Sequence, residues 1–595
     1  MSAAAQPFES TVGARLAEVA AREPDGLALG DGERRVSYGQ LAAQADEIAR
    51  ALAAAPAEGP VAVLMRHGAS FAVGVLGAMA SGRPCLPLDA DHPIARNAQI
   101  ARHAGAAAVL TQGALVQQAR ALFGDELQVL DLDALPPAPP VPGPTPDAVA
   151  AILYTSGSTG QPKGVYQSHR GVLFDALEAV TFGGIGPEDR LALVYSPTAI
   201  AGLRNLLSGL LAGASLELLS PTGLGAAGLA REINRHGLTV LRASPTLFRH
   251  VAQALRPGER LDSLRMVQLG GERVDWSDYD AFRAACGPEA AFGCHLGATE
   301  CWTLHTQWLV DEAVRGSAPR LPVGRDAPGR TVRLLGEDGA SAADGETGEI
   351  VVSSRHLALG YWREPELTAK AFGQDPEDPA ARTYRTGDLG RRRPDGLLEF
   401  EGRRDQQIKL HGYRIEPGEV EAALRGCPGV RDAAVVVRRS AAGVPKALVA
   451  YAELKPEVKG LKARHLMAMA GQKLPPQMRP AAVEILPELP WLANFKIDRQ
   501  ALERRDAAAA ASGAAPADAL ARQVAEAFEA VLGIRGVGAD DNLLSLGGDS
   551  LQAVDIALEL DRRFGLTVEE GEFEPSRSIA AWAELVRGRA KAAAG

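Results

Sequence analysis

Short apolar runs alternate with longer amphipathic segments through roughly the first 400 residues of the chain. Strands of four to eight apolar residues bounded by turns are typical of buried sheets. Such strands are predicted at Val61–Leu64, Ala107–Leu110, Ala192–Tyr195 and Leu238–Leu241. Helical spacing occurs between them, as in 41–55 and 71–80. Strands that alternate with helices predict a layered α/β architecture.

Three breaks interrupt this pattern. The proline-rich stretch 136–146 cannot be helical and predicts an extended connector. Charge density rises near Gly402, where a second region begins. The alanine-rich stretch 506–517 could be helical by propensity, but its Ser-Gly pair and Pro516 favour a flexible tether. A short, acidic, helical unit is expected beyond it.

Composition narrows the classes of function. The chain has 595 residues and a net charge of −10, which gives nucleic-acid binding no electrostatic basis. The segment 518–595 holds 14 acidic and eight basic residues, so a net −6 lies there. Five cysteines without paired metal-ligand spacing indicate a reducing compartment. We see neither a signal peptide nor an apolar run of about 20 residues, so we expect a cytoplasmic protein without membrane partners.

The loop Tyr154–Val165 alternates hydroxyl side chains with glycines and ends in Pro-Lys-Gly. Glycines let backbone N–H groups converge on an anion, and the hydroxyls and Lys163 add donors. Glycine follows the lysine, so the loop is not a Walker motif. Its position after the apolar run 148–153 favours a phosphate-binding loop over a flexible linker.

This loop resembles the phosphate loop of the adenylate-forming enzymes, the superfamily of acyl-CoA ligases and nonribosomal peptide adenylation domains. The resemblance implies ATP as cofactor. It also implies nucleotide contacts at Thr155, Ser156, Gly157, Ser158, Thr159, Gly160 and Lys163.

Further motifs follow in the order that the resemblance implies. His-Leu-Gly-Ala-Thr-Glu is similar to the segment that contacts the α-phosphate and holds magnesium, roles that fall here on Thr299 and Glu300. A carboxylate beside substrate phosphates suits Mg²⁺. Tyr-Arg-Thr-Gly-Asp is similar to the motif whose aspartate, here Asp388, accepts both ribose hydroxyls, and we add Arg403 to the nucleotide site. The segment 360–362 is similar to a structural element of the family.

Two positions depart from the family pattern: Leu296 replaces an aromatic residue near adenine, and Ala298 replaces a proline. The junction 402–419 is similar to the family's hinge region, which implies Asp405 as the hinge and Gly412 beside the thiol tunnel. Lys496 stands where the family has its catalytic lysine, although Phe495 precedes it in place of glycine. A cation there would stabilise charge that builds as a carboxylate attacks the α-phosphate.

The motif Asp541–Leu551 resembles the modification site of peptidyl and acyl carrier proteins. Ser550 would then carry 4′-phosphopantetheine, and an Asp-Ser pair can also begin a helix. An acidic surface suits a basic phosphopantetheinyl transferase as partner.

The resemblance implies a large α/β adenylation core, a small α+β subdomain and an all-α four-helix carrier domain. We place them at 1–404, 405–503 and 518–590, with a flexible linker at 504–517.

The implied reaction has two steps: a carboxylic acid and ATP·Mg²⁺ form an acyl-adenylate, and the carrier thiol of the same chain accepts the acyl group. A short tether would hold the thiol at an effective concentration in the mM range. We see no condensation, reductase or thioesterase motif. The chain therefore resembles a stand-alone loading module that passes its acyl group to a downstream synthetase, condensation or tailoring enzyme.

The acid is less clearly indicated. Amino-acid-activating relatives hold the substrate ammonium with an aspartate, and Ile200 occupies that position. The segment 195–202 contains no acid, which disfavours an ordinary α-amino acid. Alignment of the chain with these relatives at 210–216 implies a set of residues at the wall of the acid pocket. They are Ile200, Ala201, Arg204, Arg242, Gln268, Gly270, His295, Thr303 and Leu304. We hypothesise a small polar or anionic acid held by an arginine; alternatively the arginines pair with acidic neighbours.

Three alternatives remain open at this stage. The chain could be a CoA ligase that releases free thioester, which Ser550 disfavours. It could be an amino-acid-activating module with an atypical pocket. It could also be an inactive scaffold that presents a carrier domain, which the presence of Lys163, Glu300, Asp388 and Lys496 disfavours.

Overall fold

The computed structural model describes most of the chain in two compact units. The residues outside the description are 1–8, 56–57, 157–161, 303–305, 319, 337, 344, 405–407, 411, 440–444, 459, 491–496, 511–517, 533–536, 544–545, 547, 549, 567, 569–572 and 594–595. The first unit comprises Met1–Thr155, Pro162–Leu219 and Glu232–Gln406. The second comprises Ser156–Gln161, Ser220–Arg231 and Gln407–Gly595.

The described part of the first unit contains two large sheets, each mainly parallel at its centre. The seven-stranded sheet has the order β18 (Gly360–Tyr361), β8 (Lys163–Ser168), β7 (Val149–Thr155), β4 (Cys85–Asp89), β3 (Val61–Met65), β5 (Ala108–Thr111) and β6 (Gln128–Asp131). The nine-stranded sheet has the order β15 (Arg325–Asp326), β14 (Thr306–Leu309), β13 (Ala291–Leu296), β12 (Met266–Leu269), β11 (Val240–Ala243), β9 (Arg190–Leu193), β10 (Ser215–Leu218), β1 (Leu27–Asp31) and β2 (Arg34–Ser37).

A third, antiparallel sheet completes the first unit. It consists of β16 (Thr331–Leu335), β17 (Thr347–Ser354), β20 (Arg382–Arg392) and β19 (Phe372–Gln374), with β21 (Leu398–Arg403) paired to β20.

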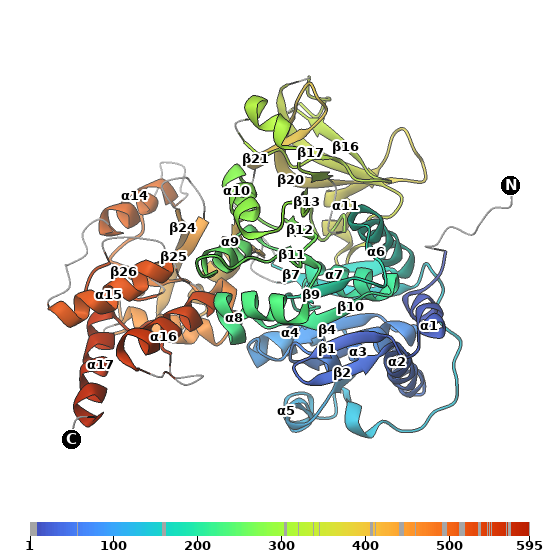
Figure 1. The fold of residues 1–595 in the computed structure, drawn as a ribbon, viewed down its shortest axis with the longest axis horizontal. Helices are drawn as coiled ribbons and strands as arrows, with labels where there is room; N and C mark the ends of the chain where they lie inside the picture. Colours follow the sequence, from blue (N-terminus) through green and yellow to red (C-terminus); the bar gives the residue numbers. More distant parts are fainter. Residues whose placement is uncertain are drawn as a thin grey trace. The chain divides into compact units, whose positions relative to one another are not determined.

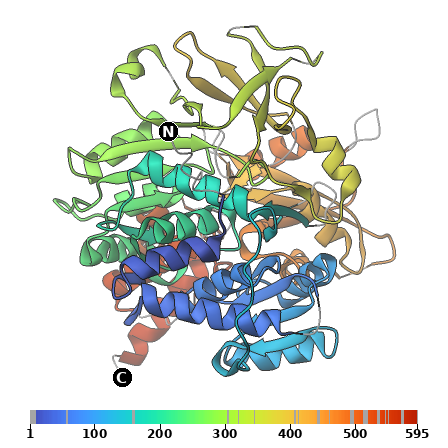
Figure 2. The same cartoon turned by 90° about the vertical axis from the view of Figure 1, so that its right-hand side faces the viewer.

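The core of the first unit lies in a helical layer between the two large sheets (Figure 1). Its buried apolar cluster takes side chains from both sheets and from α1 (Val12–Arg22), α2 (Tyr38–Ala53), α3 (Ala69–Ala80), α6 (His169–Gly183) and α7 (Ile200–Ala212). Figure 2 shows α1 and α2, in dark blue, side by side. Because α3 is buried from Ala69 to Met79, it contains no charged residue.

The other helices of this region lie outside that layer. A separate cluster packs α4 (Ile94–Ala104) and α5 (Ala114–Phe123) on the outer face of the seven-stranded sheet. The remaining helices are α9 (Pro245–Gln253), α10 (Trp276–Ala285) and α11 (Pro365–Ala371), with 3₁₀ turns at Leu132–Ala134 and Glu312–Ser317. The helix α8 (Pro221–His236) belongs to the second unit as far as Arg231 and to the first unit beyond it.

The second unit begins with a small α+β subdomain. A hairpin of β22 (Ile408–Leu410) and β23 (Tyr413–Ile415) precedes a sheet of β24 (Val430–Arg439), β25 (Pro445–Leu454) and β26 (Ala482–Leu486). The helices here are α12 (Pro417–Arg425), α13 (Ala463–Gly471) and α14 (Arg499–Ala510), with a 3₁₀ turn at Pro476–Met478. Their apolar side chains form two clusters, one on each face of the sheet.

The start of the predicted linker is helical. The helix α14 continues to Ala510, past the expected boundary at residue 504, and residues 511–517 lie outside the described part of the chain. Alanine has the highest helix propensity, and Arg438 forms a two-pronged ion pair with Asp506 (2.6 and 2.9 Å) that anchors this turn.

The carboxyl-terminal part of the chain is helical, as expected. The described residues there form α15 (Ala519–Leu532), α16 (Ser550–Phe564) and α17 (Ile579–Ala593). Phe528, Ile556 and Trp582 are fully buried in one apolar cluster shared by the three helices. Three helices are thus described where a four-helix domain was predicted.

The sequence-based prediction of layered α/β structure is confirmed. The strands predicted at 192–195 and 238–241 appear as β9 and β11, shifted by two residues in opposite directions. The stretch 136–145 has no regular secondary structure, in agreement with an extended connector. No helix in the described ranges is long and apolar enough to cross a membrane.

The close approach of α2 and α3 gives a test of the core. A Cβ atom at Gly77 would lie 2.6 Å from Ile48 Cβ, so a side chain there would push the two helices apart. We expect Gly77→Val to lower the free energy of unfolding by about 1–3 kcal/mol. Gly143→Val is the control, since no atom lies within 4 Å of that position. Equal thermal midpoints for the two variants would contradict this packing.

Candidate functional site

The predicted phosphate loop connects two antiparallel strands. Thr155 ends β7 and pairs with Lys163, the first residue of β8. The strand expected at 148–153 is therefore confirmed, and the loop is the turn of a hairpin. Thr155 Oγ1 is buried and has no hydrogen-bond partner among the described residues, so it can accept or donate to a ligand. Four of the expected contacts, at residues 157–160, lie outside the described part of the chain.

Lys163, Glu300 and Tyr361 form a buried polar cluster. Lys163 Nζ lies 3.2 Å from Glu300 Oε1 and 3.0 Å from the Tyr361 hydroxyl, which donates to the same carboxylate oxygen over 2.7 Å. Glu300 has no exposed surface, and the lysine side chain is 14% exposed. Because a buried carboxylate is unstable without a cation or donors, the lysine and the hydroxyl stabilise its charged form. The sequence motifs had indicated Lys163 and Glu300, but not Tyr361.

The backbone beside this cluster is strained at two places. Trp302 has a φ of 55° and Arg363 a φ of 60°, and they are the two non-glycine residues with positive φ in the described chain. Each follows a cluster residue, Glu300 or Tyr361, by two positions. Bulky residues rarely adopt this conformation, and such strain concentrates at functional sites.

The neighbouring Thr299 is held through its backbone. Its carbonyl accepts a hydrogen bond from Gln167 Nε2 on β8 (2.9 Å), and its side chain is largely buried. Cys301 lies two residues after Thr299, and burial raises the pKa of its thiol to about 12. This sulfur therefore stays protonated and is not a nucleophile. Leu296, which stands where the family has an aromatic residue, is buried in an apolar cluster that also contains Tyr361.

Asp388 and Arg403 are cross-strand neighbours on β20 and β21. Arg403 Nη1 donates to Asp388 Oδ1, and its Nη2 donates to the Thr386 carbonyl over 3.0 Å. The Thr386 hydroxyl accepts from the Asp388 amide (3.0 Å) and donates to the Ile350 carbonyl (2.8 Å). Asp388 is fully buried, so its carboxylate stays in one orientation. The two residues predicted together from sequence are thus brought together.

The described residues expected at the acid pocket lie on α7 and on or next to three neighbouring strands, β11, β12 and β13. Ile200 and Ala201 begin α7, whose first turn has no acidic residue. Arg242 on β11 and Gln268 on β12 are register partners, and both are buried. Gly270 must remain small, since a Cβ atom there would lie 2.1 Å from His295 Nε2. Thr303 and Leu304 lie outside the described residues.

Arg204 corrects part of the pocket hypothesis. Its guanidinium donates to Asp175 (2.9 Å) and Glu178 (3.1 Å), both on α6, and all three side chains are buried. Arg204 therefore follows the alternative interpretation, in which an arginine pairs with acidic neighbours. The signal was present in the sequence, because two acids three residues apart on an apolar helix need buried partners.

The other predicted positions are only partly described. Asp405 and Lys496 lie outside the described residues, so their roles stay predictions. Gly412 is in the turn between β22 and β23 with a φ of 80°, a conformation that favours glycine. Ser550 is the first residue of α16, so the predicted helix start is present at this serine, and its modification stays a prediction.

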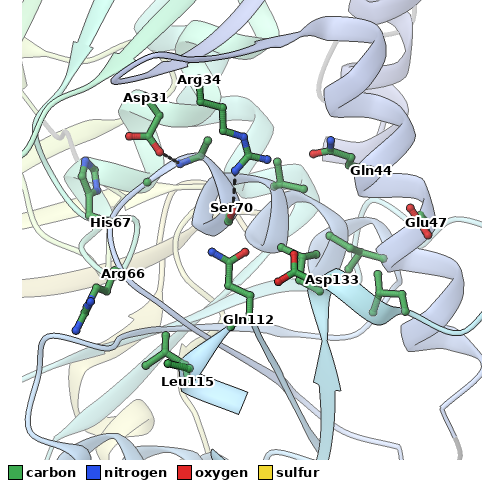
Figure 3. A pocket seen from close by; sticks show the side chains of 18 of the residues that line it. Asp31, Arg34, Gln44, Glu47, Arg66, His67, Ser70, Gln112, Leu115 and Asp133 are labelled. Carbon is green, nitrogen blue, oxygen red and sulfur yellow. Dashed lines mark hydrogen bonds between the residues drawn. The ribbon is translucent and has the colours of Figure 1, made fainter. Parts of the chain in front are cut away.

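A separate polar cavity of about 810 Å³ lies at the carboxyl ends of β3, β5 and β6 (Figure 3). Asp31 accepts from the Ala69 amide and Arg34 donates to Ser70 Oγ, each over 2.9 Å. Asp31 and Arg34 are therefore hydrogen-bonded to the first two residues of α3. None of the residues predicted at the nucleotide or acid site lines this cavity.

The cluster of Lys163, Glu300 and Tyr361 gives a direct test. We expect Tyr361→Phe to weaken ATP·Mg²⁺ binding about 10-fold or more, because a hydrogen bond to a charged group contributes about 1.5–3 kcal/mol. Calorimetric titration measures the affinity. Tyr166→Phe is the matched control, since the Tyr166 ring packs edge-on against Trp362 at 5.4 Å and would be retained. Unchanged affinity in Tyr361→Phe would show that this hydroxyl does not organise the site.

Comparison with family models gives three matches along the chain. Residues 16–362 match the AMP-binding enzyme model, and 419–496 match the AMP-binding enzyme C-terminal domain. Residues 522–586 match the phosphopantetheine attachment site. The cluster of Lys163, Glu300 and Tyr361 lies in the first match, and Ser550 lies in the third.

Similar proteins are large synthetases. Tyrocidine synthase 1 of Brevibacillus parabrevis is 31% identical over 90% of this chain and 49% of its own length. Phosphinothricin tripeptide synthetase PhsC of Streptomyces viridochromogenes is 34% identical over 93% of this chain and 50% of its own length. The chain therefore spans half or less of these curated relatives.

Solved structures of similar size also match. One is a holo NRPS protein containing adenylation and PCP domains, bound to a vinylsulfonamide inhibitor. It is 25% identical, with a TM-score of 0.77 over 98% of this chain and 97% of that one. The model of the AMP-binding enzymes covers more than half of the chain, and the motifs occur in its order. The chain therefore belongs to the family of AMP-binding enzymes, with that family's C-terminal domain and a phosphopantetheine attachment site after it.

Proposed function

We propose that the protein activates a carboxylic acid with ATP and transfers the acyl group to a phosphopantetheine thiol on its own Ser550. The observation that carries this proposal is that an AMP-binding region and a phosphopantetheine attachment site occur in one chain. Acyl transfer between them needs no second protein. A phosphopantetheinyl transferase and an acyl-accepting enzyme are the partners that such a carrier requires.

In the first step, a carboxylate oxygen of the acid attacks the α-phosphorus of ATP. The bond from the α-phosphorus to the bridging oxygen breaks, pyrophosphate leaves, and a mixed anhydride of acid and AMP remains. Lys163 and the loop donors bind phosphate oxygens, and Lys496 stabilises charge on the reacting oxygens. Asp388, held by Arg403, accepts the ribose hydroxyls.

Magnesium fits the donor set at Glu300. One buried carboxylate beside a phosphate loop suits a cation that takes its other ligands from phosphates and water. Such an ion would neutralise phosphate charge. Lys163 holds the Glu300 carboxylate over 3.2 Å, so this lysine can turn to the phosphates when another cation takes its place.

In the second step, the thiol sulfur attacks the acyl carbon of the anhydride. The carbon–oxygen bond to AMP breaks, the thiol proton is lost, and a thioester forms with AMP as leaving group. The two steps need different groups at one site, and rotation of the small subdomain about Asp405 would exchange them. Gly412 would then face the pantetheine arm.

The acid is not an ordinary α-amino acid in this proposal. The segment 195–202 offers no carboxylate for an ammonium group, and Ile200 stands at the start of α7. A helix start carries partial positive charge, and Arg204 lies one turn further on. An ammonium group at the helix start would therefore have no carboxylate partner in this segment and would face the partial positive charge of the helix.

Two other functions are less well supported. A CoA ligase that releases free thioester would have no use for Ser550. An inactive scaffold would not need the buried arrangement of Lys163, Glu300 and Tyr361.

Intact-protein mass measurement tests the proposal. The holo protein is incubated with ATP, Mg²⁺ and a pool of carboxylic acids, and we expect a mass gain of one acyl group. In Ser550→Ala this gain is lost, because no thiol is attached, while pyrophosphate release continues. Ser576→Ala is the control, since the hydroxyl of this exposed serine donates to Glu574, its neighbour on the surface. A holo protein that gains no mass but forms acyl-CoA from free CoA would establish the ligase function instead.

A further inference from the structure

The helical layer beside the pocket contains a buried set of charges with one positive charge in excess. Its carboxylates are Asp175 and Glu178 on α6, and its arginines are Arg204, Arg242 and Arg330, all largely buried. Asp175 binds Arg204 and Arg330 (2.9 and 2.7 Å). Glu178 binds Arg204 and Gln307. None of these hydrogen bonds goes to Arg242, although both carboxylates attract its charge from a distance.

Arg242 has only uncharged partners among the described residues. Its Nη1 donates to Ser208 Oγ (2.7 Å) and Asn205 Oδ1 (3.5 Å), and its Nη2 donates to the Ala179 carbonyl (3.0 Å). Burial, together with the nearby Arg204 charge, lowers the pKa of the Arg242 guanidinium to about 9, so it remains charged at neutral pH. A buried charge without a counterion is unfavourable, and proteins rarely retain one without a use.

Gln268 lies directly beside Arg242 and is also unsatisfied. The two residues are register partners on β11 and β12, so their side chains share one face of the sheet. Gln268 has no exposed surface, and neither its Oε1 nor its Nε2 has a hydrogen-bond partner among the described residues. The same is true of Arg242 Nε. Buried polar atoms are nearly always bonded, so these three atoms indicate a group supplied by a ligand.

Both residues belong to the predicted acid pocket. Gly270 and His295 continue the same face of β12 and β13, and Gly270 keeps that face open to the His295 ring. Arg242 Nε–H and the two Gln268 Nε2–H groups supply donors on this face. Donors on a buried arginine that has no hydrogen-bonded acid among the described residues match a planar carboxylate.

We propose that Arg242 and Gln268 bind a second carboxylate of the substrate, so that the activated acid is a short dicarboxylic acid. The inference rests on the proposed function, since it concerns the acid that this site activates. One carboxylate reacts with ATP and the other neutralises Arg242. Arg204 is a positioning residue, because its charge is already balanced by α6.

Loading of matched acids tests this substrate class. The series contains malonate, succinate and glutarate, the monoamide of each, and the alkanoates of equal length. We expect the holo protein to load one diacid about 100-fold or more in preference to its monoamide, because the neutral analogue leaves a buried cation unpaired. Intact mass and pyrophosphate release give the rates.

Variants assign the preference to the two residues. In Arg242→Gln the diacid-to-monoamide ratio should fall about 30-fold or more, and in Gln268→Leu it should fall to a smaller extent. Arg242→Lys should restore part of the ratio, since it restores the charge but not the planar donor. Arg190→Gln is the control, because the guanidinium of this exposed arginine on the adjacent β9 donates to the His236 carbonyl, away from the pocket residues. Thermal melting shows whether each variant is folded.

Failure of the inference and failure of the proposed function give different results. A protein that loads acids but does not distinguish diacid from monoamide, or keeps its ratio in Arg242→Gln, overturns the inference alone. If no acid releases pyrophosphate, the proposed function fails. Diacid binding, measured by calorimetry on the same wild-type and Arg242→Gln proteins, then decides the inference: Arg242-dependent binding supports it, and its absence overturns it.

Discussion

The buried carboxylate of Glu300 is the constraint on which the arrangement of the proposed nucleotide site depends. It follows β13 of the nine-stranded sheet, whereas its partners Lys163 and Tyr361 come from β8 and β18 of the seven-stranded sheet. A carboxylate with no exposed surface needs compensating partners, and Lys163 and Tyr361 are two of them. The ion pair therefore fixes the ends of two sheets relative to each other within the first unit, at the phosphate loop. The positive φ of Trp302 and Arg363 is consistent with strain held by this contact.

Charge balance also explains the second half of the site. The layer between the two large sheets is mostly apolar, yet it contains Asp175, Glu178 and three arginines. Two carboxylates neutralise two of these cations, and the third is bonded only to neutral groups among the described residues. The proposed nucleotide site and the proposed acid pocket thus follow the same rule: a buried ionic group lies where a ligand of the opposite charge is expected.

The sequence predicted those parts of the molecule that depend on local pattern. The strand before the phosphate loop and the helix α3 follow from short motifs or periodicity, whereas the hairpin and the pairing of Asp388 with Arg403 appear only in the fold. The partners of Arg204 were not assigned: the acids Asp175 and Glu178 on an apolar helix indicated that buried partners were needed, but the sequence does not show that α6 packs against α7. Arg330 reaches Asp175 from 155 residues away, a contact that one sequence cannot indicate.

Tyr361 was assigned a structural role because its hydroxyl meets Glu300 only in the fold. The extent of α14 was underestimated because Asp506 is anchored by Arg438, a long-range contact that reinforces alanine propensity.

The central claim is that one chain both activates the acid and carries the product. The dependence of the loading rate on protein concentration tests this claim most directly. Loading rates are measured for the holo wild type over a wide range of protein concentrations. They are compared with an equimolar mixture of Ser550→Ala, which in the proposal activates the acid but cannot carry it, and Lys496→Ala, which in the proposal carries the acid but cannot activate it. An intramolecular transfer predicts a wild-type rate constant that is independent of concentration, and a slower mixture whose rate rises with concentration. A wild-type rate that rises in proportion to protein concentration, and equals that of the mixture, would contradict the account.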